Sequence, residues 1–292
     1  MKSTNSTNPA IPAFAVIGHP IAHSRSPSVH AAFGKQTGIA LTYDRLDVKP
    51  ENFVTDVTAF FAQGGRGMNV TVPHKEAAYE LSKQHLSPRA QDAAAVNTLW
   101  MEEGQIHGCN TDGVGLVMDL ERQHMLGPDQ RILLLGAGGA ARGVLGPLLD
   151  TGCALICIAN RTLARAETLR DDWVKRHPDD LARLQVCTLD DDQLNQPWDL
   201  IINATSTSLG AQTLVLPEQA ITTHTAVYDM MYGSELSAFL KDSQQRQARL
   251  VSDGLGMLVC QAAESFRIWN GATPQVEPVI AHIRAELSGR VG

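Results

Sequence analysis

Residues 131–145, RILLLGAGGAARGVL, place a continuous apolar run directly before a glycine-rich turn and a helical pattern. Such a run is typical of a strand that helices cover on both faces, and therefore of a parallel sheet. The turn follows the pattern G-x-G-x-x-G/A. Gly136 permits the tight turn, Gly138 lets the backbone approach a pyrophosphate, and Ala141 allows close helix packing. The segment predicts a Rossmann-type, doubly wound α/β unit that binds a dinucleotide at a helix N-terminus. A glycine-rich turn that binds nothing is the alternative.

The next strand-like segment, CALICIAN, ends at Asn160 and is followed by Arg161 and Thr162. A dinucleotide with a free ribose 2′-hydroxyl usually meets an Asp or Glu at this point of the fold. Here Arg161 takes that place, and its guanidinium matches the oxygens of a 2′-phosphate, which a carboxylate would repel. The pattern therefore favours NADP(H) as the cofactor. The alternative is that Arg161 is only a surface residue at the start of a helix.

The chain has 292 residues, which is longer than most single domains, and it alternates between strand-like and helix-like segments. Before the dinucleotide unit, residues 13–18, 40–48 and 67–73 have the patterns of strands separated by helices. Residues 95–113 favour a hairpin around Glu103–Gly104. We therefore predict two α/β domains with a boundary near residues 112–114, preceded by a loose tail over residues 1–12.

Charge and cysteine content exclude several classes of protein. The net charge is −7 and there is no long basic run, so we expect neither nucleic acid nor a membrane surface as a partner. No stretch approaches about 18 consecutive apolar residues, so no membrane span is expected. The five cysteines are scattered and lack C-x-x-C spacing, which favours reduced thiols in the cytoplasm. His19, His23 and His30 have no second ligand cluster, so no metal site is expected.

The segment NVTVPHKEAA, residues 69–78, carries Lys75 just beyond a strand that ends at Pro73. Side chains at the carboxyl ends of strands face the ligand crevice of an α/β sheet, and an enzyme that moves a hydride must also move a proton. Asp112 in NTDG can pair with Lys75, and Asn97 at the entry to the hairpin suits substrate hydroxyls. We therefore predict a Lys75–Asp112 pair for proton transfer. The alternatives are a solvated surface lysine and an aspartate that caps a helix.

Two serines after the first strand form a second candidate site. Ser26 precedes Pro27 and has the pattern of a helix N-cap, whereas Ser24 lies two residues earlier and needs another explanation. Two hydroxyls near a helix N-terminus make a good cradle for a carboxylate. These residues therefore indicate a site for a small anionic molecule.

Nine motifs, taken together and in order, resemble the shikimate dehydrogenase family over residues 13–287. They are GHPIAHSRSP, GMNVTVPHKE, AAVNTL, GCNTDGVG, LLLGAGGAARG, NRT, INATS, YDMMY and DGLGMLVCQAA. The resemblance implies reversible, NADPH-dependent reduction of 3-dehydroshikimate to shikimate, in the pathway to chorismate and the aromatic amino acids. It implies a small-molecule substrate and leaves open whether the protein is a monomer or a homodimer.

The resemblance also implies roles for individual residues, with Lys75 and Asp112 at the positions of the catalytic pair. The substrate-binding positions correspond to Ser24, Ser26, Asn69, Thr71, Asn97, Tyr232 and Gln261. The cofactor-binding positions correspond to Gly136, Ala137, Gly138, Gly139, Ala140, Asn160, Arg161, Thr162, Ala204, Thr205, Met230, Gly254 and Met257. Because Gln261 lies on a late helix, the resemblance implies a discontinuous substrate-binding domain, residues 1–113 and 253–292, and an NADP-binding domain of residues 114–252.

The chain departs from the family pattern at two places that bear on the site. His19 stands where an asparagine is commoner, and the segment NATSTSLGAQ, residues 203–212, lacks a glycine that often follows NATS in this cofactor loop. The nearest alternative function is a quinate/shikimate dehydrogenase of broader substrate and cofactor use. A non-catalytic NADP-binding sensor is the second, and the presence of both Lys75 and Asp112 argues against it.

Overall fold

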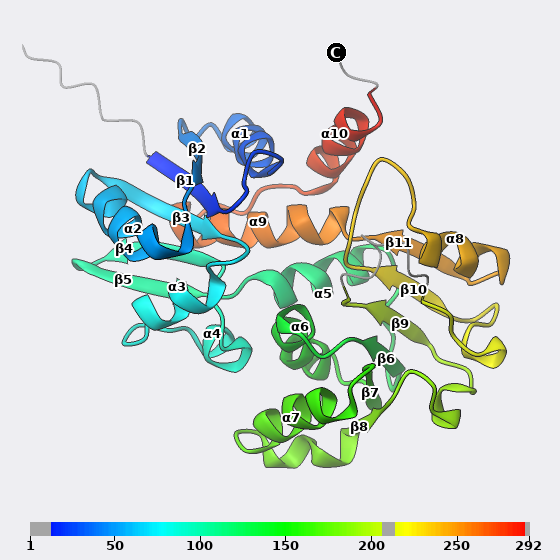
Figure 1. Cartoon of the computed structure of the whole chain (residues 1–292). Coiled ribbons are helices and arrows are strands. Elements are labelled where there is room, and N and C mark those ends of the chain that lie inside the picture. Colours follow the sequence, from blue (N-terminus) through cyan, green and yellow to red (C-terminus); the bar gives the residue numbers. More distant parts are fainter. Residues whose placement is uncertain (1–12, 206–213, 290–292) are drawn as a thin grey trace, which may run out of the picture.

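The computed structural model describes residues 13–205 and 214–289, and it contains two α/β units, each built on its own sheet (Figure 1). The predicted tail, residues 1–12, and most of the NATSTSLGAQ segment lie outside the described residues. The first sheet has the strand order β2-β1-β3-β4-β5, and the second has the order β11-β10-β9-β6-β7-β8. The prediction of a two-domain α/β fold is confirmed.

The first sheet combines parallel strands with an antiparallel hairpin. Strand β1 pairs in parallel with β2 and β3, whereas β3 with β4 and β4 with β5 are antiparallel. The hairpin turns at Glu103 and Gly104, which both have positive φ, as predicted from the sequence. The strands are β1 (Ala13–Gly18), β2 (Thr42–Asp47), β3 (Gly65–Val70), β4 (Thr98–Glu102) and β5 (Gln105–Cys109). The helices of this unit are α1 (Ser26–Thr37), α2 (Phe53–Ala62), α3 (Lys75–Leu81) and α4 (Pro88–Ala93), with a 3₁₀ turn η1 (Pro50–Asn52).

The second sheet consists of six parallel strands in the order of a doubly wound dinucleotide-binding fold. The strands are β6 (Arg131–Leu135), β7 (Leu155–Ala159), β8 (Leu184–Cys187), β9 (Leu200–Asn203), β10 (Ala226–Asp229) and β11 (Leu250–Asp253). The helices are α6 (Gly139–Asp150), α7 (Leu163–Val174) and α8 (Ala238–Gln245), with 3₁₀ turns η2 (Pro178–Arg183), η3 (Asp192–Leu194) and η5 (Glu218–Ala220).

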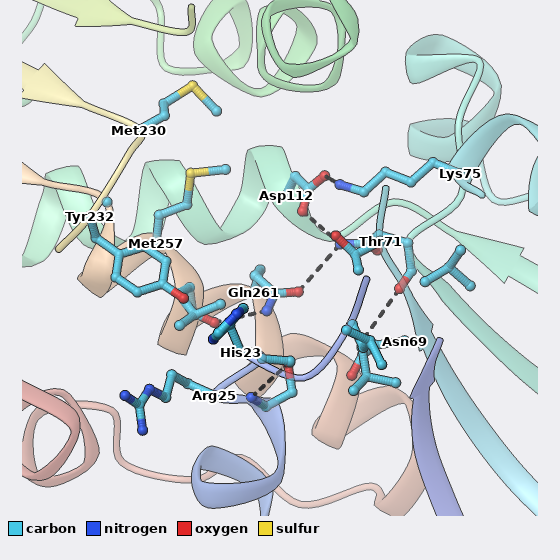
Figure 2. A pocket seen from close by; sticks show the side chains of 18 of the residues that line it. His23, Arg25, Asn69, Thr71, Lys75, Asp112, Met230, Tyr232, Met257 and Gln261 are labelled. Carbon is cyan, nitrogen blue, oxygen red and sulfur yellow. Dashed lines mark hydrogen bonds and ion pairs between the residues drawn. The ribbon is translucent and has the colours of Figure 1, made fainter. Parts of the chain in front are cut away.

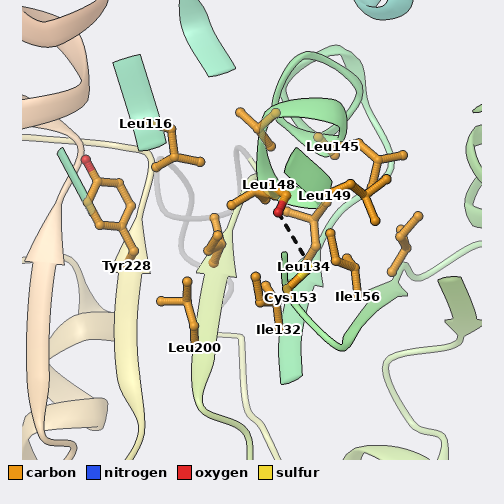
Figure 3. Packing of buried hydrophobic residues seen from close by; sticks show 14 of the residues in the cluster. Leu116, Ile132, Leu134, Leu145, Leu148, Leu149, Cys153, Ile156, Leu200 and Tyr228 are labelled. Atoms are coloured by element: carbon orange, nitrogen blue, oxygen red, sulfur yellow. Dashed lines mark hydrogen bonds between the residues drawn. The ribbon is translucent and has the colours of Figure 1, made fainter. Parts of the chain in front are cut away.

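The apolar run of β6 is explained by burial on both faces of this sheet. Ile132 and Leu134 pack under α6, where Leu145 and Leu148 cover them (Figure 3). Leu133 and Leu135 belong to a separate apolar cluster on the opposite face of the sheet. A strand with two buried faces requires a continuous apolar sequence rather than an alternating one.

Helices α5 (Asp112–Arg122) and α9 (Leu255–Asn270) lie side by side between the two sheets (Figure 1). Their close approach requires glycine, because a Cβ added at Gly115 would lie 2.6 Å from the backbone nitrogen of Gln261. Helix α9 and the following α10 (Glu277–Leu287) share an apolar cluster with α1, so the C-terminal segment returns to the first unit. None of the helices in the described ranges combines the length and apolar character needed to cross a membrane.

Replacing Gly115 with alanine is expected to lower the free energy of unfolding by about 1–3 kcal/mol, because the new methyl group has no space between α5 and α9. Urea unfolding measures the change. Gly127→Ala is the matched control, since its added Cβ would meet nothing closer than 3.7 Å. Equal stability of the two variants would contradict the tight packing of α5 on α9.

Candidate active site

A cavity of about 390 Å³ lies beyond the carboxyl ends of β1 and β3, against the first turns of α5 and α9 and the segment after β10 (Figure 2). The predicted catalytic and substrate-binding residues come from six separate segments of the sequence, and all of them line this cavity: Ser24, Ser26, Asn69, Thr71, Lys75, Asn97, Asp112, Tyr232 and Gln261. The fold therefore brings these residues together in one place.

Lys75 and Asp112 form an ion pair at one wall of the cavity (Figure 2). Each is the first residue of its helix, α3 and α5 respectively, and Nζ of Lys75 lies 2.5 Å from Oδ2 of Asp112. Their side chains are 30% and 19% exposed, so the pair is shielded from bulk water but reaches the cavity. The Asp112 carboxylate contacts Lys75 and Asn97 and makes no capping bond to α5, which argues against the helix-cap alternative.

Asn97 holds the second oxygen of the Asp112 carboxylate. Its Nδ2 donates to Oδ1 of Asp112 at 2.8 Å, and its own Oδ1 accepts the backbone N–H of Thr111 at 2.9 Å. The backbone N–H can only donate, so it fixes which end of the Asn97 amide faces Asp112. Both carboxylate oxygens thus accept a hydrogen bond, and the two bonds hold the carboxylate toward Lys75.

His74 is a structural residue beside the pair. It is buried, its Nε2 donates to the Val48 carbonyl at 2.7 Å, and its ring stacks on Phe53 with a centroid distance of 4.9 Å. These contacts fix the N-terminal end of α3, where Lys75 begins the helix.

The two serines line the cavity as predicted, but Ser26 is not the N-cap of α1. Arg25 is the N-cap of α1 and Ser26 is its first residue, so the prediction of Ser26 as the N-cap is wrong by one residue. The reason is that the Ser24 hydroxyl accepts the backbone N–H of Ser26 at 3.3 Å, which leaves the Ser26 hydroxyl without a capping role. The two Oγ atoms lie 3.2 Å apart on the cavity wall.

Two basic side chains in this region, Arg25 and His23, line the cavity but were missed by sequence reasoning (Figure 2). Burial raises the pKa of Tyr232, while the nearby Arg25 charge acts in the opposite direction. The phenol is therefore a neutral hydrogen-bond donor at physiological pH. The position of Arg25 between two serines was the available signal for a cation in a carboxylate site.

Other reactive side chains have structural explanations. His30 is buried against the Tyr43 ring with a centroid distance of 4.3 Å, and burial lowers its pKa to about 3. All five cysteines are buried and free, and burial raises the pKa of Cys109, Cys153 and Cys260, which disfavours a thiolate nucleophile at these three positions. Within residues 13–205 and 214–289, no group of three metal-binding side chains comes together.

A second cavity, of about 590 Å³, lies beyond the carboxyl ends of β6, β7 and β9. The glycine turn forms one side of it, and Gly136 has a φ of 105°, which only glycine adopts readily. A Cβ added at Gly138 or Gly139 would meet nothing within 4 Å, so the backbone at the start of α6 is open to a ligand. The predicted cofactor-binding residues in this cavity are Gly136, Ala137, Gly138, Gly139, Ala140, Asn160, Arg161, Ala204 and Thr205.

The other predicted cofactor-binding residues lie elsewhere. Met230, Gly254 and Met257 line the cavity that contains Lys75 (Figure 2). Thr162 is the N-cap of α7, and its carbonyl accepts a hydrogen bond from Asn160 Nδ2 at 2.8 Å. Arg165 also lines the second cavity, and both it and Arg161 are exposed.

Three family models match successive parts of the chain: the shikimate dehydrogenase substrate binding domain over residues 16–99, shikimate / quinate 5-dehydrogenase over residues 121–228, and the shikimate 5′-dehydrogenase C-terminal domain over residues 254–284. A shikimate dehydrogenase (NADP(+)) of Bordetella petrii is 48% identical over 277 residues, which cover 95% of this chain and 96% of that protein. The chain belongs to the shikimate dehydrogenase family.

Solved structures of shikimate dehydrogenases share the complete fold. One, in complex with NADP+, is 33% identical, covers 95% of this chain and 96% of its own, and has a TM-score of 0.86. Another, from Thermus thermophilus in complex with NADP(H) and shikimate, is 31% identical and has a TM-score of 0.79. The match covers 95% of this chain and 100% of that chain. The arrangement of two sheets joined by α5 and α9 is thus the fold of the shikimate dehydrogenase family.

Proposed function

We propose that this protein is an NADP-dependent shikimate dehydrogenase that interconverts 3-dehydroshikimate and shikimate. The proposal rests mainly on the Lys75–Asp112 ion pair, which lies in the same cavity as the hydroxyl groups of Ser24 and Ser26. Relatives that are 46–48% identical over nearly the whole chain and are named shikimate dehydrogenase (NADP(+)) support it.

The substrate cavity offers complementary groups for a small carboxylate that carries several hydroxyls. Ser24, Ser26 and Tyr232 are proposed to donate hydrogen bonds to the carboxylate. The guanidinium of Arg25, which lies 3.7 Å from the Glu286 carboxylate, is on the same side of the cavity. The opposite wall carries amide and hydroxyl groups that can bind ring hydroxyls, and we assign this role to Asn69, Thr71, Asn97 and Gln261.

Lys75 is proposed to transfer the proton at the C3 oxygen. In the reduction, its ammonium group donates a proton to the forming alkoxide, and in the oxidation the same nitrogen, deprotonated, takes the hydroxyl proton. Asp112 keeps the Lys75 amine in place through the 2.5 Å contact, and Asn97 keeps Asp112 in place. NADP(H), when bound, supplies or accepts the hydride at the carbon that carries this oxygen.

The described residues fit NADP(H). The open backbone over residues 136–140 suits a pyrophosphate, and the exposed guanidinium of Arg161 suits a 2′-phosphate, with Asn160 and Thr162 beside it. Ala204 and Thr205 are proposed to complete the nucleotide site, and Met230, Gly254 and Met257 to receive the nicotinamide end next to Lys75.

We further propose that residues 1–113 and 253–292 act as the substrate-binding domain and residues 114–252 as the NADP-binding domain. The cluster that α9 and α10 share with α1 supports this division. A cytoplasmic location is proposed because all five cysteines are free. Either a monomer or a homodimer is compatible with a site whose groups all come from one chain.

Steady-state rates with shikimate and with quinate, each with NADP+ and with NAD+, test the proposal. We expect the highest kcat/KM for shikimate with NADP+. Comparable rates for quinate or for NAD+ would favour the broader quinate/shikimate enzyme, an alternative supported by the family model that carries both names. Binding of NADP+ without turnover of either substrate would favour the non-catalytic sensor.

A further inference from the structure

A line of hydrogen-bonding groups starts at the half-buried Tyr43 and runs through the interior to Asp112. The Tyr43 hydroxyl donates to Oδ1 of Asn69 at 2.7 Å, and His30 Nε2 lies 3.2 Å from the same oxygen. His30 is neutral because burial lowers its pKa to about 3, and its Nδ1 has no partner among the described residues. The hydrogen therefore resides on Nε2, which donates. With two donors at Oδ1, the Asn69 amide is fixed with its Nδ2 pointing the opposite way.

From Asn69 the line continues through two buried hydroxyls to Asn97. Asn69 Nδ2 donates to Ser265 Oγ at 3.0 Å, Ser265 Oγ lies 2.8 Å from Thr98 Oγ1, and Thr98 Oγ1 donates to Asn97 Oδ1 at 2.8 Å. A threonine hydroxyl has a single hydrogen, so Thr98 can only accept from Ser265. The competing acceptors for Ser265, the carbonyl of Gln261 at 3.1 Å and the Thr111 hydroxyl at 3.3 Å, both lie farther away.

Every bond in this line points its hydrogen toward Asp112. The last bond runs from Asn97 Nδ2 to Asp112 Oδ1 at 2.8 Å, and Asp112 Oδ2 contacts Lys75. Hydrogen bonds that run in one direction polarise one another, and a low-dielectric interior strengthens the effect. Thr98 and Ser265 are both 0% exposed and do not belong to the cavity wall, so they do not contact substrate.

We infer that Thr98 and Ser265 are positioning residues for proton transfer, because their hydroxyls hold the Asn97 amide with its N–H toward Asp112 and so fix the carboxylate against Lys75. The inference rests on the proposed function, since it assigns the pair to proton transfer. Loss of the Thr98 hydroxyl removes the shortest hydrogen bond at Asn97 Oδ1, at 2.8 Å, and leaves only the N–H and the hydroxyl of Thr111, at 2.9 Å and 3.2 Å, to hold the amide. An Asn97 amide that turns over would present its oxygen to the Asp112 carboxylate, and two acceptors repel each other.

The test compares Thr98→Val, which removes the hydroxyl, with Thr98→Ser, which retains it. For shikimate oxidation with NADP+, we expect Thr98→Val to lower kcat about tenfold with KM for NADP+ within about twofold of the wild type. Thr98→Ser should keep kcat within about threefold of the wild type. If Thr98 had only a structural role, Thr98→Val would change kcat and the KM for NADP+ together, and Thr98→Ser would not restore kcat.

Ser265→Ala interrupts the same line of hydrogen bonds in α9 instead of β4. It therefore tests the inference independently if Thr98→Val does not fold. It should also lower kcat, by about threefold to tenfold. Ser243→Ala is the matched control, because Ser243 is a buried helical serine that donates to a carbonyl four residues earlier at 2.8 Å, outside this line. Its kcat should equal that of the wild type.

Two results would overturn the inference while leaving the proposed function intact: Thr98→Val and Ser265→Ala variants with wild-type kcat, or a Thr98→Ser variant as slow as Thr98→Val. A wild-type chain that does not oxidise shikimate would overturn the proposed function and the inference together.

Discussion

Lys75→Ala is expected to lower kcat for shikimate oxidation about a thousandfold, because the variant lacks the group that takes the hydroxyl proton. The KM for shikimate should change less than about fivefold, since the lost interaction belongs mainly to the transition state. The structure favours this split, because Lys75 directs its charge to Asp112 at 2.5 Å while other residues form the carboxylate cradle. Steady-state NADPH formation at saturating NADP+ measures both constants.

Two further variants separate proton transfer from simple charge. Lys75→Arg retains a cation beside Asp112, but a guanidinium does not release its proton in proteins, so kcat should stay as low as in Lys75→Ala. Lys83→Ala removes a nearby lysine that pairs with Glu80 at 2.8 Å on the surface, and its kcat should be that of the wild type. Near-normal turnover by Lys75→Arg would show that Lys75 acts only through its charge.

The sequence predicted the parts of the fold that local patterns encode. The run before Gly136 is apolar at every position because both faces of β6 are covered, and that condition is visible in a single segment. The turn at Gly136 between a strand and a helix, and Arg161 after the next strand, were likewise predicted from the residues next to them in the sequence. Of the nine residues that line the substrate cavity, Lys75, Asp112, Asn97 and the two serines were indicated by their own segments. The family resemblance added Asn69, Thr71, Tyr232 and Gln261 and placed all nine in one site.

Apart from the Lys75–Asp112 pair, contacts between distant segments were not predicted from the sequence. Asn69 and Ser265 are 196 residues apart, and no periodicity or composition connects them. Their contact depends on how tightly α9 packs between the sheets, which in turn depends on Gly115 in α5. The cap of α1 was misplaced for a related reason: both Ser24 and Ser26 have suitable side chains, and only the backbone geometry decides which of them accepts an N–H.

Arg161→Asp is expected to lower kcat/KM for NADP+ about a hundredfold or more, because a carboxylate at this position repels a 2′-phosphate. With NAD+ the same change should leave kcat/KM equal or raise it, since a carboxylate can accept a hydrogen bond from a free 2′-hydroxyl. The kcat at saturating NADP+ should change little, because Arg161 and Lys75 line different cavities. Initial rates over a range of each cofactor at saturating shikimate measure the preference.

The control must carry the same change in net charge without facing the nucleotide cavity. Arg170→Asp meets this condition, since Arg170 lies on the same helix, α7, pairs with Asp171 at 2.8 Å and is not part of the cavity wall. If Arg170→Asp weakened NADP+ use as much as Arg161→Asp, long-range charge would explain the preference. If neither variant altered the ratio of NADP+ to NAD+ use, the exposed Arg165 in the same cavity would be the next residue to replace, and the assignment of the 2′-phosphate to Arg161 would be wrong.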